Sequence, residues 1–310
     1  MPTSWPPSTR AIWKWQSKSA NDTLTILSVA PERPVDPLAI EILKQVDRVA
    51  QELGLEYFVT GATARDILLS GVFGLDTGRG TRDVDLAIAI DGWSQFEAVK
   101  RRLVETGAFA SDEHVMHRLF HLREPGRRSY PLDLIPFGPI EEPANEIAWP
   151  PDRSIVMNVA GYREALAAAP PVEIQPGFVV RVVSLPGLAI LKLFAWADRG
   201  AGDPRDAIDL VTLLRQYGEA GNEDRLYGAE IEALETLRYD LDLAGPRLLG
   251  RDAARITGPT TRDRILALLD DAGRWDQLLG HMARAFRGAD DPIAKAEALI
   301  VQFKEGLREI

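Results

Sequence analysis

The sequence predicts an α+β fold, in which a mixed β-sheet flanked by helices precedes a helical C-terminal domain. Two observations predict it. Between residues 36 and 185, helical patterns of apolar residues alternate with short runs of β-branched and aromatic residues, which are typical of strands. From Leu185 onward only the helical spacing continues. We therefore expect an N-terminal arm over residues 1–35, a sheet domain over 36–185 and a helical domain over 186–310.

The predicted sheet domain begins at Asp36-Pro37, because an N-cap acid followed by proline is typical of a first helical turn. Gly54 ends that helix, and Pro-Gly pairs at 125–126 and 176–177 predict hairpins. The expected strands cover residues 24–27, 56–60, 82–90, 114–122 and 130–137, with a pair of short strands within 172–183. The expected helices cover residues 36–54, 63–69, 93–106 and 161–169, and the segments 70–81 and 138–154 are expected to be irregular.

The predicted helical domain begins where Pro186 takes a first-turn position. Its helices are expected over residues 188–198, 207–217, 227–242, 262–272 and 294–307. The chain shows no internal repeat and no low-complexity tract. Packed on the sheet domain, these helices would complete a cleft over the polar residues described below.

The composition is that of a globular protein, and it excludes several kinds of site. Of the 310 residues, 45% are hydrophobic and 26% are charged. The absence of cysteine excludes disulfides and thiolate metal ligands and fits a reducing cytoplasm, the location we expect. No apolar run approaches the roughly 20 residues that span a bilayer, so we expect no membrane partner. The net charge of −10 argues against a nucleic-acid coat but is compatible with a local basic patch.

Three aspartates stand out within the expected strands. Side chains alternate along a strand, so Asp83 and Asp85 share one face of the strand at 82–90, whose other face is apolar. Asp133 lies between two leucines, where an aspartate is rare unless it is paired or binds a metal. If the two strands are neighbours, three carboxylates converge, and divalent cations would relieve their repulsion. Mg²⁺, or Mn²⁺ in its place, prefers such oxygen ligands. A lone Asp-x-Asp, by contrast, is usually a solvated strand face.

Gly61-Ala62 lies between an expected strand and an expected helix start. Glycine lets the backbone approach a phosphate closely, and a helix N-terminus offers free N–H groups and the positive end of a dipole. Alone the pair is a weak signal, because a glycine after a strand usually marks a turn. Together with the three aspartates it predicts a binding site for a nucleoside triphosphate.

Two pairs of motifs resemble known enzymes. VTGATARDILL at residues 59–69, followed by RDVDL at 82–86, resembles the polymerase-β-type nucleotidyltransferase superfamily, in particular its tRNA nucleotidyltransferase and poly(A) polymerase branch. LAILKLFAWADR at 188–199, followed by RDAIDL at 205–210, is similar to the signature of AbiEii-type nucleotidyltransferases, the toxin-like enzymes of type IV toxin–antitoxin systems. The matched motifs lie within roughly residues 57–214 and leave both ends of the chain uncovered.

The resemblance implies a nucleotidyltransferase-type sheet and a role for each matched residue. Asp83 and Asp85 would hold metals on the triphosphate, and Asp133 would hold the catalytic metal and orient or deprotonate the attacking hydroxyl. Lys192 would contact the phosphates across the cleft, and Asp206 would position Lys192 or Arg199. The implied catalytic residues are Asp83, Asp85, Asp133, Lys192 and Asp206. The implied nucleotide-binding residues are Gly61, Ala62, Thr63, Arg65, Lys192 and Arg199, with Arg65 alternatively bonded to the neighbouring Asp66.

Two departures from the family pattern bear on these roles. Ala62 stands where the superfamily usually has serine or glycine, so a side-chain hydroxyl for the phosphate is missing while backbone N–H donors remain. We expect weakened rather than absent nucleotide binding. The loop over residues 70–81 is longer than in compact relatives and fits a mobile lid or a substrate contact.

Simpler interpretations of several residues remain open. Lys192 on an apolar helix can extend its amine to solvent, and Arg205, Asp206 and Asp209 can form a charged helix start, because acids favour the first turn. The basic segments at 100–102, expected to be exposed, and at 123–128 are candidate RNA contacts or solvated faces. Along a strand, His117 and His121 would share a face while His114 faces away, so the three histidines do not fit a zinc site. We expect them to line a sheet face near Asp133.

The sequence therefore supports three functional hypotheses. The first is Mg²⁺-dependent transfer of a nucleoside monophosphate from a nucleoside triphosphate to an RNA or tRNA 3′ end, a protein or a small molecule, with an antitoxin as partner if the enzyme is a toxin. The second is a catalytically weak or inactive module of the same fold that binds a nucleotide or a partner, with Ala62 as the first step of decay. The third, an antibiotic-modifying enzyme, shares the chemistry of the first and differs in its acceptor.

Overall fold

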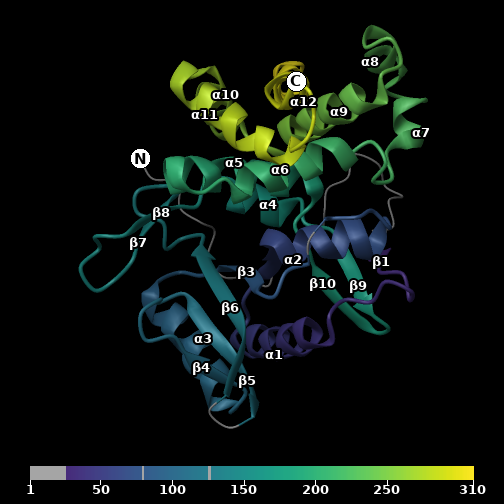
Figure 1. Cartoon of the computed structure of the whole chain (residues 1–310). Coiled ribbons are helices and arrows are strands. Elements are labelled where there is room, and N and C mark those ends of the chain that lie inside the picture. The colour runs from purple at the N-terminus through teal and green to yellow at the C-terminus, as the bar shows by residue number, and fades with distance from the viewer. Residues whose placement is uncertain (1–25, 79, 125–126) are drawn as a thin grey trace, which may run out of the picture.

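The computed structural model describes residues 26–78, 80–124 and 127–310, and it has the α+β architecture expected from the sequence. A central sheet has five strands in the order β2-β3-β6-β5-β4 (Figure 1). The strands are β2 (Tyr57–Thr60), β3 (Val84–Ala89), β4 (Phe109–Ser111), β5 (Arg118–Glu124) and β6 (Arg127–Phe137). β3 and β6 are parallel neighbours and the other pairs are antiparallel, so the sheet is mixed.

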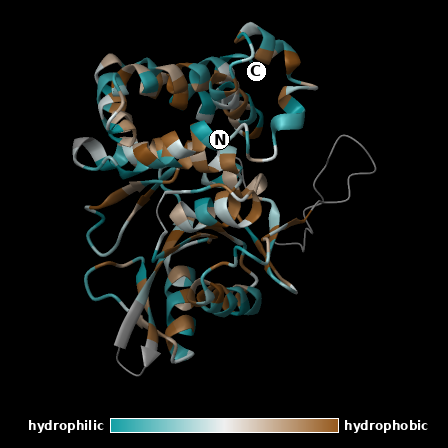
Figure 2. Cartoon of the chain, turned by 45° about the vertical axis from the view of Figure 1, so that its right-hand side comes forward, coloured by the Kyte–Doolittle hydropathy of each residue, from teal (hydrophilic) through white to brown (hydrophobic). Residues whose placement is uncertain are grey.

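Helices α1 (Pro37–Leu53) and α3 (Trp93–Glu105) pack against this sheet, and each has the amphipathic pattern expected. α1 begins and ends as predicted, since the Asp36 carboxylate accepts a bond from Leu38 N at 2.8 Å and Gly54 closes the helix at a φ of 68°. Figure 2 shows hydrophobic and hydrophilic residues alternating along the helices, as in helices that bury one face. The residues that α1 buries are Ala39, Ile42, Leu43, Val46, Val49 and Ala50.

The helix after β2 begins two residues earlier than expected. α2 (Gly61–Arg65) starts directly after Thr60 and continues as a π-helical segment over Asp66–Val72. Gly61 has a φ of 64°, which glycine adopts without the steric cost that other residues meet. The chain therefore turns from strand to helix within one residue, and the expected loop begins only after Val72.

Two smaller sheets accompany the central one in the described residues. The first contains β1 (Leu27–Ser28), β9 (Pro171–Gln175) and β10 (Phe178–Arg181), and the second contains β7 (Glu146–Ala148) and β8 (Val156–Asn158). A bridge between Val59 and Val182 links the first to the central sheet. The hairpin around Pro176-Gly177 is confirmed. β4, β7 and β8, each of only three residues, were not expected from the sequence. Of the expected strand at 24–27, residues 24 and 25 lie outside the described residues, and β1 begins at Leu27.

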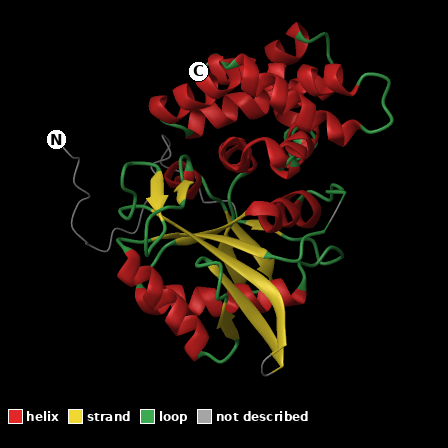
Figure 3. Ribbon diagram, turned by 60° about the vertical axis from the view of Figure 1, so that its left-hand side comes forward, coloured by secondary structure: helices red, strands yellow, loops and turns green. Residues whose placement is uncertain are grey.

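The remaining helices form a layer on the other side of the sheet from α1 and α3 (Figure 3). The short α4 (Tyr162–Ala167) lies beneath this layer. The layer itself consists of α5 (Leu185–Arg199), α6 (Arg205–Gln216), α7 (Glu223–Leu226), α8 (Ile231–Thr236), α9 (Leu241–Ile256), α10 (Pro259–Asp270), α11 (Ala272–Met282) and α12 (Pro292–Arg308), with 3₁₀ turns at Gly200–Gly202 and Ala283–Phe286.

The prediction of a single helix over residues 227–242 is wrong. That stretch holds the end of α7's turn, all of α8 and the start of α9, while α9 and α11 were not expected at all. Gly245-Pro246 misleads, because the pair is normally a turn signal yet lies inside α9. A Cβ at Gly245 would stand 2.9 Å from the backbone nitrogen of Gly218, so close packing between segments explains the glycine.

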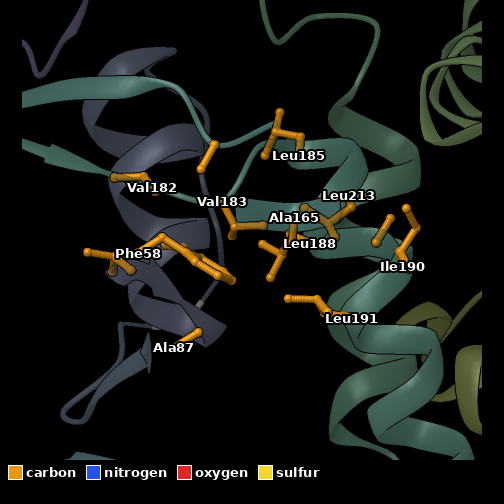
Figure 4. Close-up of a cluster of buried hydrophobic side chains, with 14 of the residues drawn as sticks. Phe58, Ala87, Ala165, Val182, Val183, Leu185, Leu188, Ile190, Leu191 and Leu213 are labelled. Atoms are coloured by element: carbon orange, nitrogen blue, oxygen red, sulfur yellow. The ribbon is translucent and has the colours of Figure 1, made fainter. Parts of the chain in front are cut away.

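A hydrophobic seam joins the sheet to the helical layer. Figure 4 shows Phe58 on β2 together with Leu188 and Leu191 on α5, with Val183 in the segment that precedes α5. These side chains belong to one continuous cluster of buried residues that extends through both parts. α5 begins at Leu185, where the composition of the chain changes, but the division into separate domains stays a prediction. No described helix is long and apolar enough to cross a membrane.

Helices α9 and α12 approach each other until their backbones touch. A Cβ at Gly250 would stand 2.1 Å from the Phe303 carbonyl oxygen, and one at Gly306 would stand 2.1 Å from the Arg247 carbonyl oxygen. Backbone cannot move aside as a flexible side chain can, so these two glycines set the distance between the helices.

We expect Gly250→Ala to lower the free energy of unfolding by about 1–3 kcal/mol, because the added methyl must push the helices apart. Gly280→Ala is the matched control on α11, where nothing lies within 4 Å of the new Cβ. The control should gain stability, since alanine is about 1 kcal/mol more favourable than glycine within a helix. Chemical denaturation measures both, and equal stabilisation of the two variants would contradict the close contact.

Candidate active site

The parallel pairing of β3 with β6 brings two of the predicted carboxylates side by side. Asp85 is the register partner of Asp133, so both side chains leave adjacent strands on the same face. Asp83 directly precedes β3 and stands two residues before Asp85, which gives it the same phase. Thr60 of β2 pairs with Asp85 from the other side. The two strands are thus neighbours, as the predicted convergence requires.

Gly61 lies directly against the Asp85 carboxylate. A Cβ at this position would stand 2.0 Å from Asp85 Oδ2, and the φ of 64° is itself unfavourable for other residues. Two independent constraints therefore exclude a side chain at residue 61. The next residue of α2, Ala62, is partly exposed and carries no hydroxyl.

Two threonines hold Asp83 in place. The buried Thr63 donates its hydroxyl to the Asp83 carbonyl oxygen at 2.6 Å, and the Thr81 hydroxyl bonds to the Asp83 carboxylate. Thr63 therefore links α2 to the start of β3. Its predicted contact with a nucleotide stays a prediction, because the bond described for its hydroxyl goes to Asp83.

Arg118 is a partner of the third carboxylate that the sequence analysis did not identify. It stands opposite Asp133 in the β5–β6 pairing, and its guanidinium donates from Nε and Nη2 to the two oxygens of Asp133, each at 2.7 Å. Asp133 is buried, so this pair is partly shielded from water. A sequence reader could find Arg118 only after knowing the register of two strands 15 residues apart.

Lys192 on α5 is held by two carboxylates of α6. Its Nζ donates to Asp206 Oδ1 at 2.9 Å and to Asp209 Oδ2 at 2.7 Å. Arg199, at the end of α5, bonds to the other oxygen of Asp206. Asp206 therefore contacts both Lys192 and Arg199, and Asp209 also contacts Lys192, while the predicted positioning role of Asp206 stays a prediction. The interpretation of Lys192 as a residue that extends to solvent is wrong, because only 11% of its side chain is exposed.

Arg65 connects this cluster to the sheet side of the site. Its side chain is 1% exposed and donates from Nη1 to Asp209 Oδ1 at 2.5 Å. It also donates from Nε and Nη2 to Asp66 Oδ1 at 3.0 and 2.7 Å, which is the local bond that the sequence analysis allowed. Asp66 in turn accepts from the Thr81 backbone N–H at 3.1 Å. Arg65 is thus enclosed by protein, and a direct nucleotide contact stays a prediction.

The electrostatics of the cluster show how the parts face one another. The pKa of Asp85 is raised from 3.8 to about 7, chiefly by burial and then by the charges of Asp83 and Asp133, while Lys192 and Arg199 oppose the rise. Burial opposes the charge of Lys192, yet Asp209 and Asp206 raise its pKa above the ordinary value. The carboxylates of the sheet therefore face cations of the helical layer across the site.

Tyr162 is a further residue of this face that no sequence motif indicated. It begins α4, and its ring lies 5.8 Å from that of Phe137 and 6.2 Å from that of Phe58. Burial raises the pKa of its phenol, and the charge of Asp85 raises it further. Tyr162 is therefore a buried phenol that packs on Phe58 and Phe137 and is influenced by the charge of Asp85.

The expectations for the histidines are only partly met. His117 precedes β5, and its ring lies 5.3 Å from Trp149. Burial lowers its pKa, and the charge of Asp133 opposes this, so His117 is near that carboxylate. His121 is on the opposite face of the sheet, three positions along β5 from the partner of Asp133, and packs against Phe109. Its predicted place near Asp133 is wrong, because an odd spacing along a strand reverses the face.

Of the two basic segments, residues 100–102 were expected to be exposed, and the structure describes their side chains. Lys100 is buried, which corrects that expectation, and its amine lies 5.7 Å from the Phe96 ring centroid. Arg102 is ion-paired with Glu52 at 2.8 Å and Glu105 at 3.0 Å. The side chains over residues 123–128 lie outside the described ones. RNA binding by either segment stays a prediction.

The carboxylate oxygens of the three aspartates are suitable ligands for a hard divalent cation. Oxygen ligands converging on one face are what Mg²⁺ or Mn²⁺ requires. In this structure, however, some of these oxygens are already bonded to other side chains. Asp133 is bound by Arg118 and Asp83 by Thr81. Among the described residues, no three acidic or histidine side chains are already arranged around a common metal position.

Comparisons with known proteins return one family model and several solved structures. The model described as nucleotidyl transferase AbiEii toxin, type IV TA system, matches residues 42–295. No curated protein sequence matches the chain.

The structural likenesses are distant. An antigenic nucleotidyltransferase-like protein from Paracoccidioides brasiliensis is 16% identical over 66% of this chain and 93% of its own, with a TM-score of 0.38. JHP933 from Helicobacter pylori is 13% identical over 89% and 94%, with a TM-score of 0.35. ANT(2″)-Ia in complex with adenylyl-2″-tobramycin is 20% identical over 66% and 97%, with a TM-score of 0.33.

The buried ion pair of Arg65 yields a stability prediction. We expect Arg65→Met to lower the free energy of unfolding by about 3–5 kcal/mol, because it leaves the buried Asp209 without one of its cations. Arg205→Met is the matched control, since Arg205 is 66% exposed and its partner Asp203 lies at the surface. The control should cost about 1 kcal/mol or less. Denaturant titration of both variants measures the difference, and similar losses would show that Arg65 is not the stronger contact.

The raised pKa of Asp85 predicts a pH dependence. Between pH about 4 and about 7 the folded protein holds a proton on Asp85 that the unfolded chain has released. The contribution of Asp85 to the free energy of unfolding therefore falls as pH rises through that window and stays low above it. Without divalent cations, Asp85→Asn should be more stable than wild type at about pH 8 and should lack this decline.

Thermal unfolding with a chelator, from about pH 5 to about pH 8, measures the effect. Asp290→Asn, at an exposed position in the turn before α12, is the control and should follow the wild-type curve. Parallel curves for Asp85→Asn and wild type would contradict the assignment to Asp85.

Proposed function

We propose that this chain, which belongs to the AbiEii nucleotidyl transferase toxin family, transfers a nucleoside monophosphate from a nucleoside triphosphate to an acceptor hydroxyl. The observation that carries the proposal is the meeting of Asp85 and Asp133 on one face, with Asp83 beside them and Lys192 opposing their charge. In the reaction, the acceptor oxygen bonds to the α-phosphorus while the bond from that phosphorus to the β-phosphate oxygen breaks. Pyrophosphate leaves, and the acceptor proton passes to Asp133.

Mg²⁺, or Mn²⁺, is the cofactor we propose for this site. Asp83, Asp85 and Asp133 would hold it, because such cations prefer carboxylate oxygens together with phosphates. When bound, the cation neutralises charge that develops on the α-phosphate and the pyrophosphate. The raised pKa of Asp85 supports this assignment, since crowded carboxylates favour a positive charge between them.

The chain's own groups would bind and orient the triphosphate. The backbone N–H groups at the start of α2, at Gly61 and Ala62, are suited to phosphate oxygens because they begin a helix. Lys192 keeps its charge beside Asp206 and Asp209 and would contact the phosphates from the helical layer. Arg199, which is 52% exposed, can reach the same anion. These contacts hold the α-phosphorus in place for the acceptor.

The acceptor and the biological role are further parts of the proposal. RNA, such as a tRNA 3′ end, a protein or a small molecule all present a suitable hydroxyl. The family description names a type IV toxin–antitoxin system, which supports an antitoxin as the partner that opposes this enzyme.

A second candidate is a nucleotide-binding or partner-binding module with little activity. Two observations favour it: the hydroxyl missing at Ala62, and the capture of both Asp133 oxygens by Arg118. In its nucleotide-binding form, the module differs from the first candidate in one respect, because it would bind a nucleoside triphosphate without releasing pyrophosphate.

The test is to incubate the full chain with each α-labelled nucleoside triphosphate, Mg²⁺ or Mn²⁺, and tRNA, cell protein or a pool of small molecules. We expect label on one acceptor class, with pyrophosphate released in equal amount. Asp83→Asn should reduce the rate by roughly 10² or more, because stabilisation of the transferring phosphate is lost. Asp290→Asn, remote and exposed, is the control and should keep the wild-type rate.

Each result separates the candidates. Nucleotide binding without label or pyrophosphate would establish the inactive module instead. If neither binding nor transfer occurs with any of the four nucleotides, both the transferase and the nucleotide-binding module fail, and only a partner-binding module remains. Label on tRNA, on protein or on a small molecule identifies the acceptor class.

A further inference from the structure

Arg118 engages both oxygens of Asp133 in a side-by-side pair. The two bonds, from Nε and Nη2, are each 2.7 Å long. The β5–β6 register places the residues opposite each other, so the sheet itself brings the guanidinium to the carboxylate. The Asp133 side chain is 11% exposed while that of Arg118 is 32% exposed, so the guanidinium remains accessible to an incoming anion.

The three aspartates of the site are therefore held unequally. Asp83 is bonded to the neutral hydroxyl of Thr81, and Asp85 senses Lys192 and Arg199 as charges across the site. Asp133 has a bidentate pair with an ion, and charge-assisted bonds of this kind are about twice as strong as neutral ones. Asp133 consequently has the strongest bond to give up before it can serve as a ligand.

We infer that Arg118 is a positioning residue that withholds Asp133 from divalent cations until a nucleoside triphosphate arrives. The inference rests on the proposed function, since it takes Asp83, Asp85 and Asp133 as metal ligands. An oxygen of Asp133 must lose its bond to the guanidinium before it can bind a cation. A triphosphate competes for that guanidinium with several anionic oxygens, which suit its planar donors. Arg118 then turns from Asp133 to the phosphates and frees the third ligand.

This arrangement sets an order of assembly. Without a nucleotide, cations bind through Asp83 and Asp85, and Asp133 stays paired with Arg118. With a nucleotide, all three carboxylates are available. The residue proposed to receive the acceptor's proton is thus freed only when there is a phosphate to transfer.

The experiment measures Mn²⁺ binding rather than turnover. Free Mn²⁺ is followed by electron paramagnetic resonance in the full chain, without nucleotide and with a triphosphate whose α,β-bridge is an uncleavable methylene. Without nucleotide, we expect Arg118→Met to bind Mn²⁺ about tenfold more tightly than wild type, because the bond to Asp133 no longer has to break. The gain in affinity that the analogue produces in wild type should shrink about tenfold in the variant.

Three variants separate this effect from others. Arg118→Lys keeps the charge but cannot form two parallel bonds, so it should bind Mn²⁺ with an affinity between those of wild type and Arg118→Met. Asp133→Asn should leave binding without nucleotide unchanged and weaken binding with the analogue about tenfold. Arg102→Met removes an exposed arginine of α3 that pairs with Glu52 of α1 and is the matched control, expected to be unchanged. Circular dichroism establishes that each variant folds, and Asp133→Asn carries the test if Arg118→Met does not.

The inference is overturned if Arg118→Met binds no more tightly than wild type without nucleotide. It is also overturned if Arg118→Lys equals wild type while Arg118→Met binds more tightly, because net charge alone would then explain the gain. Weakened binding by Asp133→Asn without nucleotide would show that Asp133 is already available. A wild-type chain that binds no Mn²⁺ with or without the analogue would instead overturn the proposed metal site itself.

Discussion

Buried charges must be paired, and in this protein that requirement joins the two parts of the site. Arg65, on the helix that follows β2, is enclosed by protein and bonds to Asp209 of α6. Asp209 also binds Lys192 of α5, and Asp206 completes the pair of carboxylates around the same amine. Breaking one member would leave another charge buried without its partner. The network therefore fixes the position of Lys192 relative to the start of α2, while the hydrophobic seam supplies the bulk of the contact.

The sheet side of the site has the opposite problem, because like charges are brought together. The register of β3 and β6 sets Asp85 beside Asp133, and Asp83 adds a third carboxylate. Burial and repulsion raise the pKa of Asp85, whereas Arg118 neutralises Asp133 directly. Lys192 and Arg199 oppose the remaining charge across the site. A cluster of this kind is unstable by itself and is stabilised by cations, whether they come from the protein or from a metal bound with substrate.

Much of the fold can be predicted from local sequence patterns. Where the prediction from sequence is wrong, the error has a specific physical cause. Helix α1 is bounded by a capping aspartate and a closing glycine, both local signals, so the sequence predicts it within a residue. α9 was missed because Gly245-Pro246 has the form of a turn, yet close contact with Gly218 keeps the glycine inside a helix. The three-residue strands β4, β7 and β8 are too short to show an alternating pattern and exist only through pairing.

For the site, the sequence alone determined which residues we expect to carry chemistry: the Asp-x-Asp on an alternating strand, the isolated Asp133, the glycine at a strand-to-helix junction and the Lys192–Asp206 signature. These depend on residue type and short spacing. Only the tertiary structure decided what each one touches. Arg118, Asp209 and Tyr162 join the site through strand register and helix packing, and Gly61 is required because Asp85 occupies the space of its side chain. Partners distant in the chain leave no local trace, since sequence spacing within one element says nothing about the element that packs against it.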